Sequence, residues 1–357
     1  MHINDLLEMS VARCASDLHL KIGAYPVLRI NGELTAQADI GIITAEDMSK
    51  IFHDITTERE RAEFVKELEA DFAYQLKDIG RFRINICQHT GTIGLSCRPV
   101  RTEMPTIEGL ELPPVCQEFA LKGSGLVIVT GPTGCGKSTT LAAMMNYLNH
   151  SIHRKIITIE DPVEYLHRDN KCFFSQREIG RDTRSFADAL KHAMRQDPDV
   201  ILVGEMRDLE TMSAVLTAAE TGHLVLTTLH TPSTPGAIDR FIDVFPPYQQ
   251  SQVRVQLSIV LEGVIYQLLV PRADGSGRVA ALETMIATPA IRNLIREGKT
   301  FQLMNTIQTG KEYGMQTLNQ SLAELSHRGT ITLDEALARS GDPEELKEMA
   351  NGQKAKS

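Results

Sequence analysis

A glycine-rich segment, GPTGCGKS at residues 131–138, limits the possible folds of this chain more than any other feature. It fits the phosphate-binding loop pattern G-x-x-x-x-G-K-[ST] at every fixed position. The apolar run Leu126–Val129 before it suits a buried parallel strand, and the segment from Ser138 onward suits a helix. The alternative is a chance glycine-rich turn, but the order of strand, loop and helix favours a nucleoside triphosphate site.

The loop supplies the first group of expected site residues. Its backbone N–H groups and the following helix N-terminus are expected to close around phosphate oxygens. We expect Lys137 to reach the β- and γ-phosphates and the Ser138 hydroxyl to bind Mg²⁺. Cys135 is interpreted as a small spacer, since nothing supports a redox role. The expected nucleotide-binding residues of the loop are Gly131, Pro132, Thr133, Gly134, Cys135, Gly136, Lys137, Ser138 and Thr139.

Composition excludes several classes of protein. The chain has 357 residues, enough for two or three domains, and a net charge of −9 with scattered Lys and Arg, which argues against nucleic-acid binding. Its six cysteines form no C-x-x-C pair, so we expect no zinc and reduced thiols. The longest apolar run, Leu257–Val270, is too short to span a bilayer, and the N-terminus lacks a secretory signal. We therefore expect a cytoplasmic protein without direct membrane insertion, which can dock on a membrane through a partner.

The hydrophobic pattern predicts two domains joined by a linker. Residues 1–100 read as a small α+β domain, in which Arg81–Ile86 alternates apolar and polar side chains as a half-buried strand does. Residues 101–115 contain three prolines and no firm periodicity, which predicts a linker or hinge.

From 116 to 357 strands and helices alternate, a pattern typical of a parallel α/β sheet. The predicted strands are Gly125–Thr130, Lys155–Ile159, Val200–Gly204, His223–Thr228 and a later one near Val279–Met285. The predicted helices between them include Ser138–Leu148, Ser185–Met194 and Asp208–Thr221. A helical C-terminal part is expected over 288–345, and the polar tail from Gly341 is expected to fray.

Acidic residues follow two of the predicted strands. Glu160, Asp161 and Glu164 come after Lys155–Ile159, and Glu205 comes after Val200–Gly204. In open α/β sheets ligands bind at the carboxyl ends of the strands, where carboxylates can manage Mg²⁺ and a water molecule. The alternative for the first group is an acidic surface loop, and an apolar strand ending in an acid is weak evidence alone.

Two histidines and three arginines complete the set of expected site residues. His223 and His230 flank a strand, and they are interpreted either as ordinary strand-end polar residues or as sensors of the γ-phosphate; a metal site would need more ligands. Arg81, Arg83 and Arg98 read either as an exposed strand face or as arginines that complete a neighbour's site in a ring of subunits.

Taken together, these segments resemble the secretion-superfamily ATPases of type II secretion and type IV pili. GPTGCGKST resembles their Walker A motif, ITIEDPVEY their aspartate box, DVILVGEMRD their atypical Walker B motif and HLVLTTLH their histidine box. ASDLHL and PVLRINGEL resemble the start of their PAS-like N-terminal domain, and RFRIN the strand that carries inter-subunit arginines.

Within the superfamily, the chain is most similar to the pilus retraction (twitching motility) ATPases. It starts directly at the PAS-like domain, it lacks a tetracysteine zinc module, and AIRNLIRE at 290–297 resembles a helix typical of retraction motors. That helix places Ile291, Leu294 and Ile295 on one face. Two departures are Cys135, where the family more often has Ser, and the region Cys87–Cys97.

The resemblance implies an α/β fold with a RecA-like P-loop ATPase domain and a helical C-terminal appendix, preceded by a small PAS-like α+β domain. It implies a homohexamer that hydrolyses ATP with Mg²⁺ and acts on an inner-membrane pilus platform protein, binding peripherally to the membrane through it. Glu164 would orient or deprotonate water, and Glu205 would hold the Mg²⁺-bound water. His230, alone or with His223, would sense the γ-phosphate.

By the same resemblance, Arg81, Arg83 and Arg98 would reach ATP across a subunit interface, and the hinge would let the N-terminal domain swing. Three alternatives stay open: a pilus assembly or type II secretion ATPase, an accessory retraction paralogue, and a regulatory subunit that does not hydrolyse ATP.

Overall fold

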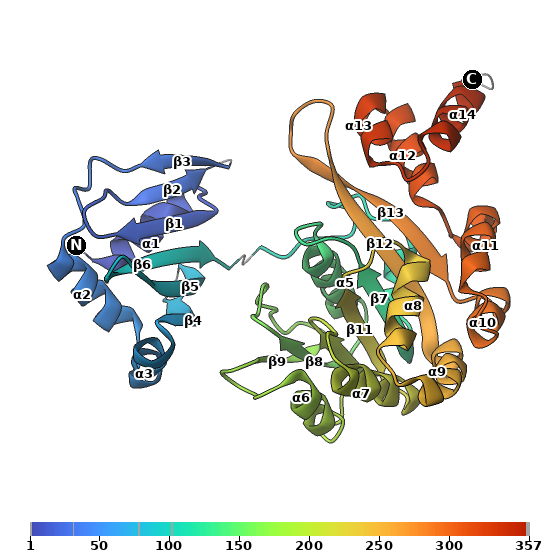
Figure 1. The fold of residues 1–357 in the computed structure, drawn as a ribbon, viewed down its shortest axis with the longest axis horizontal. Helices are drawn as coiled ribbons and strands as arrows, with labels where there is room; N and C mark the ends of the chain where they lie inside the picture. Colours follow the sequence, from blue (N-terminus) through green and yellow to red (C-terminus); the bar gives the residue numbers. More distant parts are fainter. Residues whose placement is uncertain (1, 31, 78, 101–102, 355–357) are drawn as a thin grey trace. The chain divides into compact units, whose positions relative to one another are not determined.

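The computed structural model describes residues 2–30, 32–77, 79–100 and 103–354. The chain divides into two compact units, Met1–Glu103 and Met104–Ser357 (Figure 1). Each has a β-sheet and a hydrophobic core of its own.

The first unit is an antiparallel six-stranded sheet with helices over one face. Its strands are ordered β3-β2-β1-β6-β5-β4. The strands are β1 (Asp17–Lys21), β2 (Val27–Ile30), β3 (Glu33–Ala36), β4 (Glu69–Leu76), β5 (Gly80–His89) and β6 (Thr92–Pro99). The helices are α1 (Ile3–Ala12), α2 (Ala45–Ile55) and α3 (Glu58–Glu67).

Strand β5 shows why this sheet has one covered face. Phe82, Ile84 and Ile86 are fully buried and pack with apolar residues of α1 and α2. Arg81 and Arg83 alternate with them and therefore point to the other face. The predicted period-two strand is confirmed.

The second unit contains a seven-stranded sheet in the order β13-β12-β7-β11-β10-β8-β9 (Figure 1). The strands from β12 to β9 run parallel to their neighbours, and β13 runs antiparallel to β12. The strands are β7 (Gly125–Thr130), β8 (Lys155–Glu160), β9 (Phe173–Glu178), β10 (Val200–Val203), β11 (Leu224–Leu229), β12 (Leu261–Pro271) and β13 (Arg278–Ile286). Because the strands are parallel, the loops after β7, β8, β10 and β11 lie at one edge of the sheet.

Helices cover both faces of this sheet. The α-helices are α4 (Val115–Ala120), α5 (Lys137–Ser151), α6 (Phe186–Ala193), α7 (Leu209–Glu220), α8 (Thr234–Asp243), α9 (Pro247–Val260), α10 (Pro289–Arg296), α11 (Leu303–Thr309), α12 (Leu318–His327), α13 (Leu333–Arg339) and α14 (Pro343–Lys354). Two short 3₁₀ helices, η1 (Thr300–Gln302) and η2 (Lys311–Tyr313), flank α11. In β7, Leu126 and Ile128 belong to the core cluster shared with α6 to α10, whereas Val127 and Val129 belong to the cluster shared with α4 and α5.

The apolar run Leu257–Val270 is divided between the end of α9 and strand β12. The structure differs from the sequence-based expectation in two other places. The predicted linker 101–115 is mostly part of the second unit, because Ile107 and Leu112 are buried in its core; residues 101 and 102 lie outside the described residues. The tail does not fray at Gly341, since α14 packs against α12 and α13 with its Leu346 fully buried.

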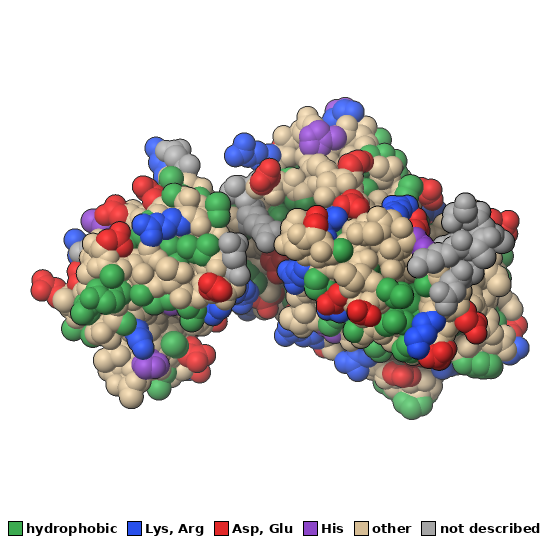
Figure 2. Space-filling model, turned by 90° about the horizontal axis from the view of Figure 1, so that it is seen from above, with side chains coloured by type: hydrophobic (Ala, Val, Ile, Leu, Met, Phe, Trp, Pro, Cys, Tyr) green, Lys and Arg blue, Asp and Glu red, His purple; other side chains and the backbone are tan. Residues whose placement is uncertain are grey.

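On the face shown in Figure 2, basic and acidic side chains are interspersed rather than grouped by sign. Within the described ranges, no helix combines the length and apolarity that crossing a bilayer requires.

Candidate nucleotide site

The phosphate loop connects the end of β7 to the start of α5. Gly131 and Gly136 have φ values of 145° and 90°, a region that favours glycine. A Cβ atom on Gly131 would lie 2.4 Å from the backbone oxygen of Gln267, and one on Gly136 would lie 2.9 Å from Nε2 of the same residue. Backbone conformation therefore favours glycine at both positions, and close packing against the backbone of β12 requires it at Gly131.

Lys137 lies across the loop that precedes it. Its Nζ donates hydrogen bonds to the carbonyl oxygens of Gly131 at 2.9 Å and of Pro132 at 3.0 Å. Lys137 is only 8% exposed, and this burial lowers the pKa of its amine, an effect that the negative charges of Glu205 and Glu164 oppose. A buried cation beside backbone carbonyls is chemically suited to receive an anionic phosphate.

His230 lies between Lys137 and Glu205. The Nζ of Lys137 is 3.5 Å from Nδ1 of His230, and Nε2 of His230 is 3.8 Å from a carboxylate oxygen of Glu205. Burial, followed by the positive charge of Lys137, lowers the pKa of His230. The ring is therefore neutral at pH 7, with Nδ1 accepting from Lys137 and the proton assigned to Nε2. The other carboxylate oxygen of Glu205 is 2.7 Å from an Arg207 nitrogen.

The carboxylates after β8 differ in environment. Glu160 is enclosed: it accepts hydrogen bonds from Thr158 at 2.6 Å and from Gln176 at 3.3 Å, and burial raises its pKa. Glu164 is exposed, and its backbone N–H donates to Glu160 at 3.4 Å. The next residue, Tyr165, contacts Thr139 at the start of α5, so this loop lies beside the phosphate loop.

Side chains of β9 hold the loop that carries Glu164. The sequence analysis did not identify these β9 residues. The Gln176 amide donates to the Tyr165 carbonyl at 2.9 Å, and a Glu178 oxygen accepts from the Val163 N–H at 3.1 Å. The Tyr165 hydroxyl is 3.0 Å from the Thr139 hydroxyl on α5. The sequence analysis did not predict β9 as a strand, so it gave no indication that Gln176 and Glu178 hold this loop.

His223 does not lie in this cluster, which corrects its expected nucleotide contact within one subunit. In the parallel register Leu224 is opposite Gly125 and Leu229 is opposite Thr130. His223 therefore lies at the edge where β7 begins, roughly 20 Å of strand from His230. Its Nδ1 is 3.0 Å from the Ala218 carbonyl oxygen, so it takes part in the turn after α7.

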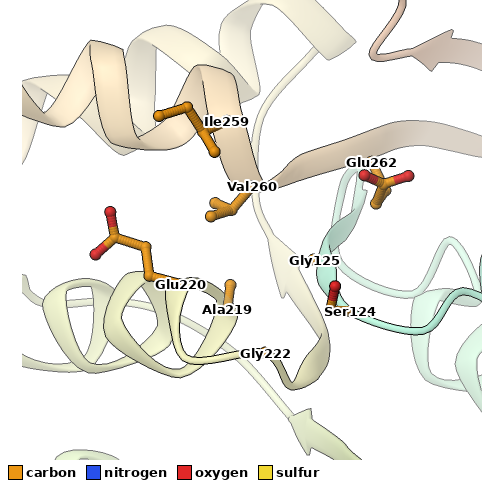
Figure 3. Close-up of a pocket in the computed structure, with 8 residues that line it drawn as sticks. All are labelled: Ser124, Gly125, Ala219, Glu220, Gly222, Ile259, Val260 and Glu262. Carbon is orange, nitrogen blue, oxygen red and sulfur yellow. The ribbon is translucent and has the colours of Figure 1, made fainter.

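A cavity of about 360 Å³ also lies at that opposite edge. Figure 3 shows Ala219 and Glu220 at the end of α7, facing Ile259 and Val260 at the end of α9. Because it adjoins the first residue of β7, Gly125, it is separate from the phosphate loop.

The three expected arginines lie in the first unit. Arg83 on β5 is directly opposite Arg98 on β6. Arg98 forms an ion pair with Asp17 at 2.7 Å, and Arg29 approaches the same carboxylate at 3.9 Å. Arg81 is half-buried on β5.

The oxygen donors at the loop suit a hard cation. Ser138 is in the first turn of α5 and Glu205 follows β10, so a hydroxyl and a carboxylate come from the two elements that meet at the carboxyl edge of the sheet. These two residues fit the ligand chemistry of Mg²⁺.

Comparison with known proteins assigns the family. The model of the type II/IV secretion system protein family matches residues 113–338. The chain belongs to this family. It is 46% identical to the type IV pilus retractation ATPase PilT of Pseudomonas aeruginosa over 96% of this chain and 99% of that protein. It is 39% identical to the type IV pilus ATPase PilU of the same organism over 98% of this chain and 91% of that protein.

A solved structure shares the whole fold. The crystal structure of the pilus retraction motor PilT with bound ADP matches with a TM-score of 0.92 at 44% identity, over 97% of this chain and 99% of that one. The predicted fold class is confirmed: α/β, with a small α+β domain followed in the chain by a RecA-like P-loop ATPase domain.

Proposed function

We propose that this chain is an ATPase that powers the retraction of a type IV pilus. The observation that carries the proposal is the conjunction of a phosphate loop, a buried Lys137 and a strand-end Glu205 in a chain that is 46% identical to a retraction ATPase over nearly its full length. The substrates are ATP and water, and the products are ADP and phosphate.

The residues around the loop divide the chemistry between them. Gly131 to Thr139 bind the phosphates, with Lys137 exchanging its loop carbonyls for β- and γ-phosphate oxygens. Ser138 and Glu205 would hold Mg²⁺, Glu205 partly through water, and the bound ion would neutralise phosphate charge. Glu164, exposed at the end of its loop, orients or deprotonates the attacking water.

His230 is the proposed sensor of the γ-phosphate. Its neutral ring contacts Lys137 through Nδ1, so any movement of the Lys137 amine toward phosphate alters the position of the ring. Glu205, a carboxylate that would hold Mg²⁺, lies on the other side of the ring, with an oxygen 3.8 Å from Nε2 of His230.

A neighbouring subunit of a homohexamer completes the site. Arg81, Arg83 and Arg98 reach ATP across the interface, where they stabilise charge as the phosphoryl group transfers. Hydrolysis moves the N-terminal unit about a hinge near the boundary between Glu103 and Met104. The ring works in the cytoplasm, against an inner-membrane pilus platform protein, without entering the membrane and without nucleic acid.

Two related functions are less well supported. Type II secretion system protein E of Xanthomonas campestris aligns over only 50% of this chain and 30% of its own length, which disfavours a secretion or assembly ATPase. An accessory retraction role stays the other alternative, because a second type IV pilus ATPase, PilU, is also similar over 98% of this chain.

Phosphate release by the purified full-length protein tests the proposal. Lys137→Ala is expected to lower ATP turnover at least about a hundredfold, because the phosphates lose their buried cation. Lys171→Ala is a matched control, since Lys171 donates to the Ser151 carbonyl at the far end of α5. Normal turnover by Lys137→Ala contradicts the site, and no turnover by the wild type supports a non-hydrolysing regulatory subunit.

A further inference from the structure

Gln267 is a buried polar residue in an otherwise apolar part of β12. It is 2% exposed, and its neighbours along the strand include Val264, Ile265 and Val270, all fully buried. Tyr266 pairs with Thr130, the last residue of β7, so Gln267 lies beside the start of the phosphate loop.

The Gln267 amide connects the loop to the helix that follows it. Its Nε2 donates to the Cys135 carbonyl at 2.6 Å, and its Oε1 accepts from the Thr140 hydroxyl at 2.7 Å. Both partners are buried. One side chain therefore satisfies a loop carbonyl and a hydroxyl in the first turn of α5.

The bond to Cys135 sets the direction of a peptide plane. In a trans peptide the C=O and the next N–H point in opposite directions. Because the Cys135 carbonyl points at Gln267, the Gly136 N–H points away from Gln267. An N–H turned away from the strand is available to a phosphate oxygen.

Packing keeps the loop against the same residue. The backbone oxygen of Gln267 is 2.4 Å from the position of a Cβ on Gly131, so even a methyl group would not fit between loop and strand. The loop thus packs against β12 at Gly131 and is hydrogen-bonded to it at Cys135.

We propose that Gln267 is a positioning residue, which holds the phosphate loop in its anion-binding conformation before nucleotide arrives. The inference rests on the proposed ATPase function and adds a residue that acts through the loop, without contact to the reacting atoms. Removing its amide frees the peptide between Cys135 and Gly136 to rotate and leaves the Cys135 carbonyl without its donor.

The test compares Gln267→Met, Thr140→Val and a control, Thr284→Val, in the full-length protein. Met keeps the length of the side chain but has no amide. Thr284 is buried on β13, opposite Ile265, and its hydroxyl has no hydrogen-bond partner within the described ranges, so its replacement removes a buried hydroxyl that makes no bond to the loop. ADP affinity is measured by calorimetry, ATP turnover by phosphate release, and folding by thermal melting.

Gln267→Met is expected to raise the Kd for ADP and the KM for ATP together by about tenfold, with kcat changed less than about threefold. Thr140→Val is expected to raise both by about threefold, and Thr284→Val to leave them unchanged. A lower melting temperature with unchanged KM would show a merely structural role and overturn the proposal. If Gln267→Met does not fold, an unchanged Kd in Thr140→Val overturns it.

Failure of the two proposals gives different results. A wild-type protein that neither binds ADP nor hydrolyses ATP contradicts both. A wild-type protein that is active, beside a Gln267→Met variant with wild-type affinity, contradicts only the role of Gln267.

Discussion

The side-chain amine of Lys137 lies 3.5 Å from Nδ1 of His230, although 93 residues separate them in the chain. The parallel register of β7 and β11 produces this contact, because it aligns Thr130 with Leu229 and places the residues after them at one edge. Since burial and Lys137 lower the pKa of His230, its ring is neutral where Lys137 is charged.

Protonation of His230 should therefore slow turnover at acidic pH. A lowered pKa means that this loss begins below the ordinary value of 6.5. We expect His230→Gln to lower turnover about tenfold and to remove this acid limb of the pH profile. His223→Gln is the control, because His223 lies at the opposite edge of the sheet, and it should keep wild-type turnover and pH dependence. Wild-type turnover in His230→Gln together with lowered turnover in His223→Gln would contradict the placement of His230 at the nucleotide.

Glu164→Gln should separate binding from hydrolysis. The exposed Glu164 carboxylate is proposed to act on water, whereas the loop backbone binds phosphate; turnover should fall by about a hundredfold or more while ADP affinity stays within about threefold. Asp161→Asn replaces another exposed carboxylate of the same loop and should keep turnover. Loss of ADP binding in Glu164→Gln would assign this residue a different role.

The stability of the second unit should fall as pH is lowered, because of His167. Its ring stacks on Phe174 with centroids 4.6 Å apart, and burial lowers its pKa from 6.5 to about 4. The unfolded chain therefore binds a proton between these values that the folded chain does not, which destabilises the fold as pH falls through this range. The loss is at most about 2 kcal/mol between about pH 7 and pH 5.

Urea unfolding at the two pH values measures this effect. His167→Gln should reduce the difference, whereas His150→Gln, at an exposed position on α5, should not. An unchanged pH dependence in His167→Gln would refute the assignment.

Several parts of the site could be predicted from the sequence, and the reasons are local. The loop pattern and the apolar runs before it and before Glu205 predict two strands of a parallel sheet, whose carboxyl ends meet at one edge. The strand between His223 and His230 has six residues, so its flanking residues lie at opposite edges. Strand length alone was enough to separate the two histidines, although both were expected at the nucleotide.

Other parts depended on long-range packing. A short apolar run such as Leu257–Val270 has no period that distinguishes helix from strand, and only contacts with β7 and β13 make its second part β12. Gln267 is a polar residue within this run, and only the fold brings it to its hydrogen-bond partners, Cys135 and Thr140. In the tail, Leu346 is an apolar residue in a largely polar segment, and its burial among residues of α12 and α13 stabilises α14.

Arg292 on α10 should stabilise the junction between α9 and β12. It donates to the carbonyl oxygens of Ala287 at 2.8 Å and Ser258 at 2.9 Å, and it pairs with Glu262 at 2.9 Å. Arg292→Ala should therefore lower the free energy of unfolding by about 2 kcal/mol, because these bonds involve a charged donor.

Denaturant unfolding checks this value. Arg296→Ala, an exposed position on the same helix, should change stability by less than about 0.5 kcal/mol. Equal effects of the two substitutions would mean that the contacts of Arg292 contribute little.

The central claim, that ATP hydrolysis at the phosphate loop drives pilus retraction, is tested most directly in cells whose native copy carries Lys137→Ala. Surface pili are counted by electron microscopy and twitching is measured on the same strain. We predict abundant pili and no twitching, because assembly continues while retraction stops. Cells without pili would identify an assembly ATPase, and cells with normal pili and normal twitching would contradict the retraction function.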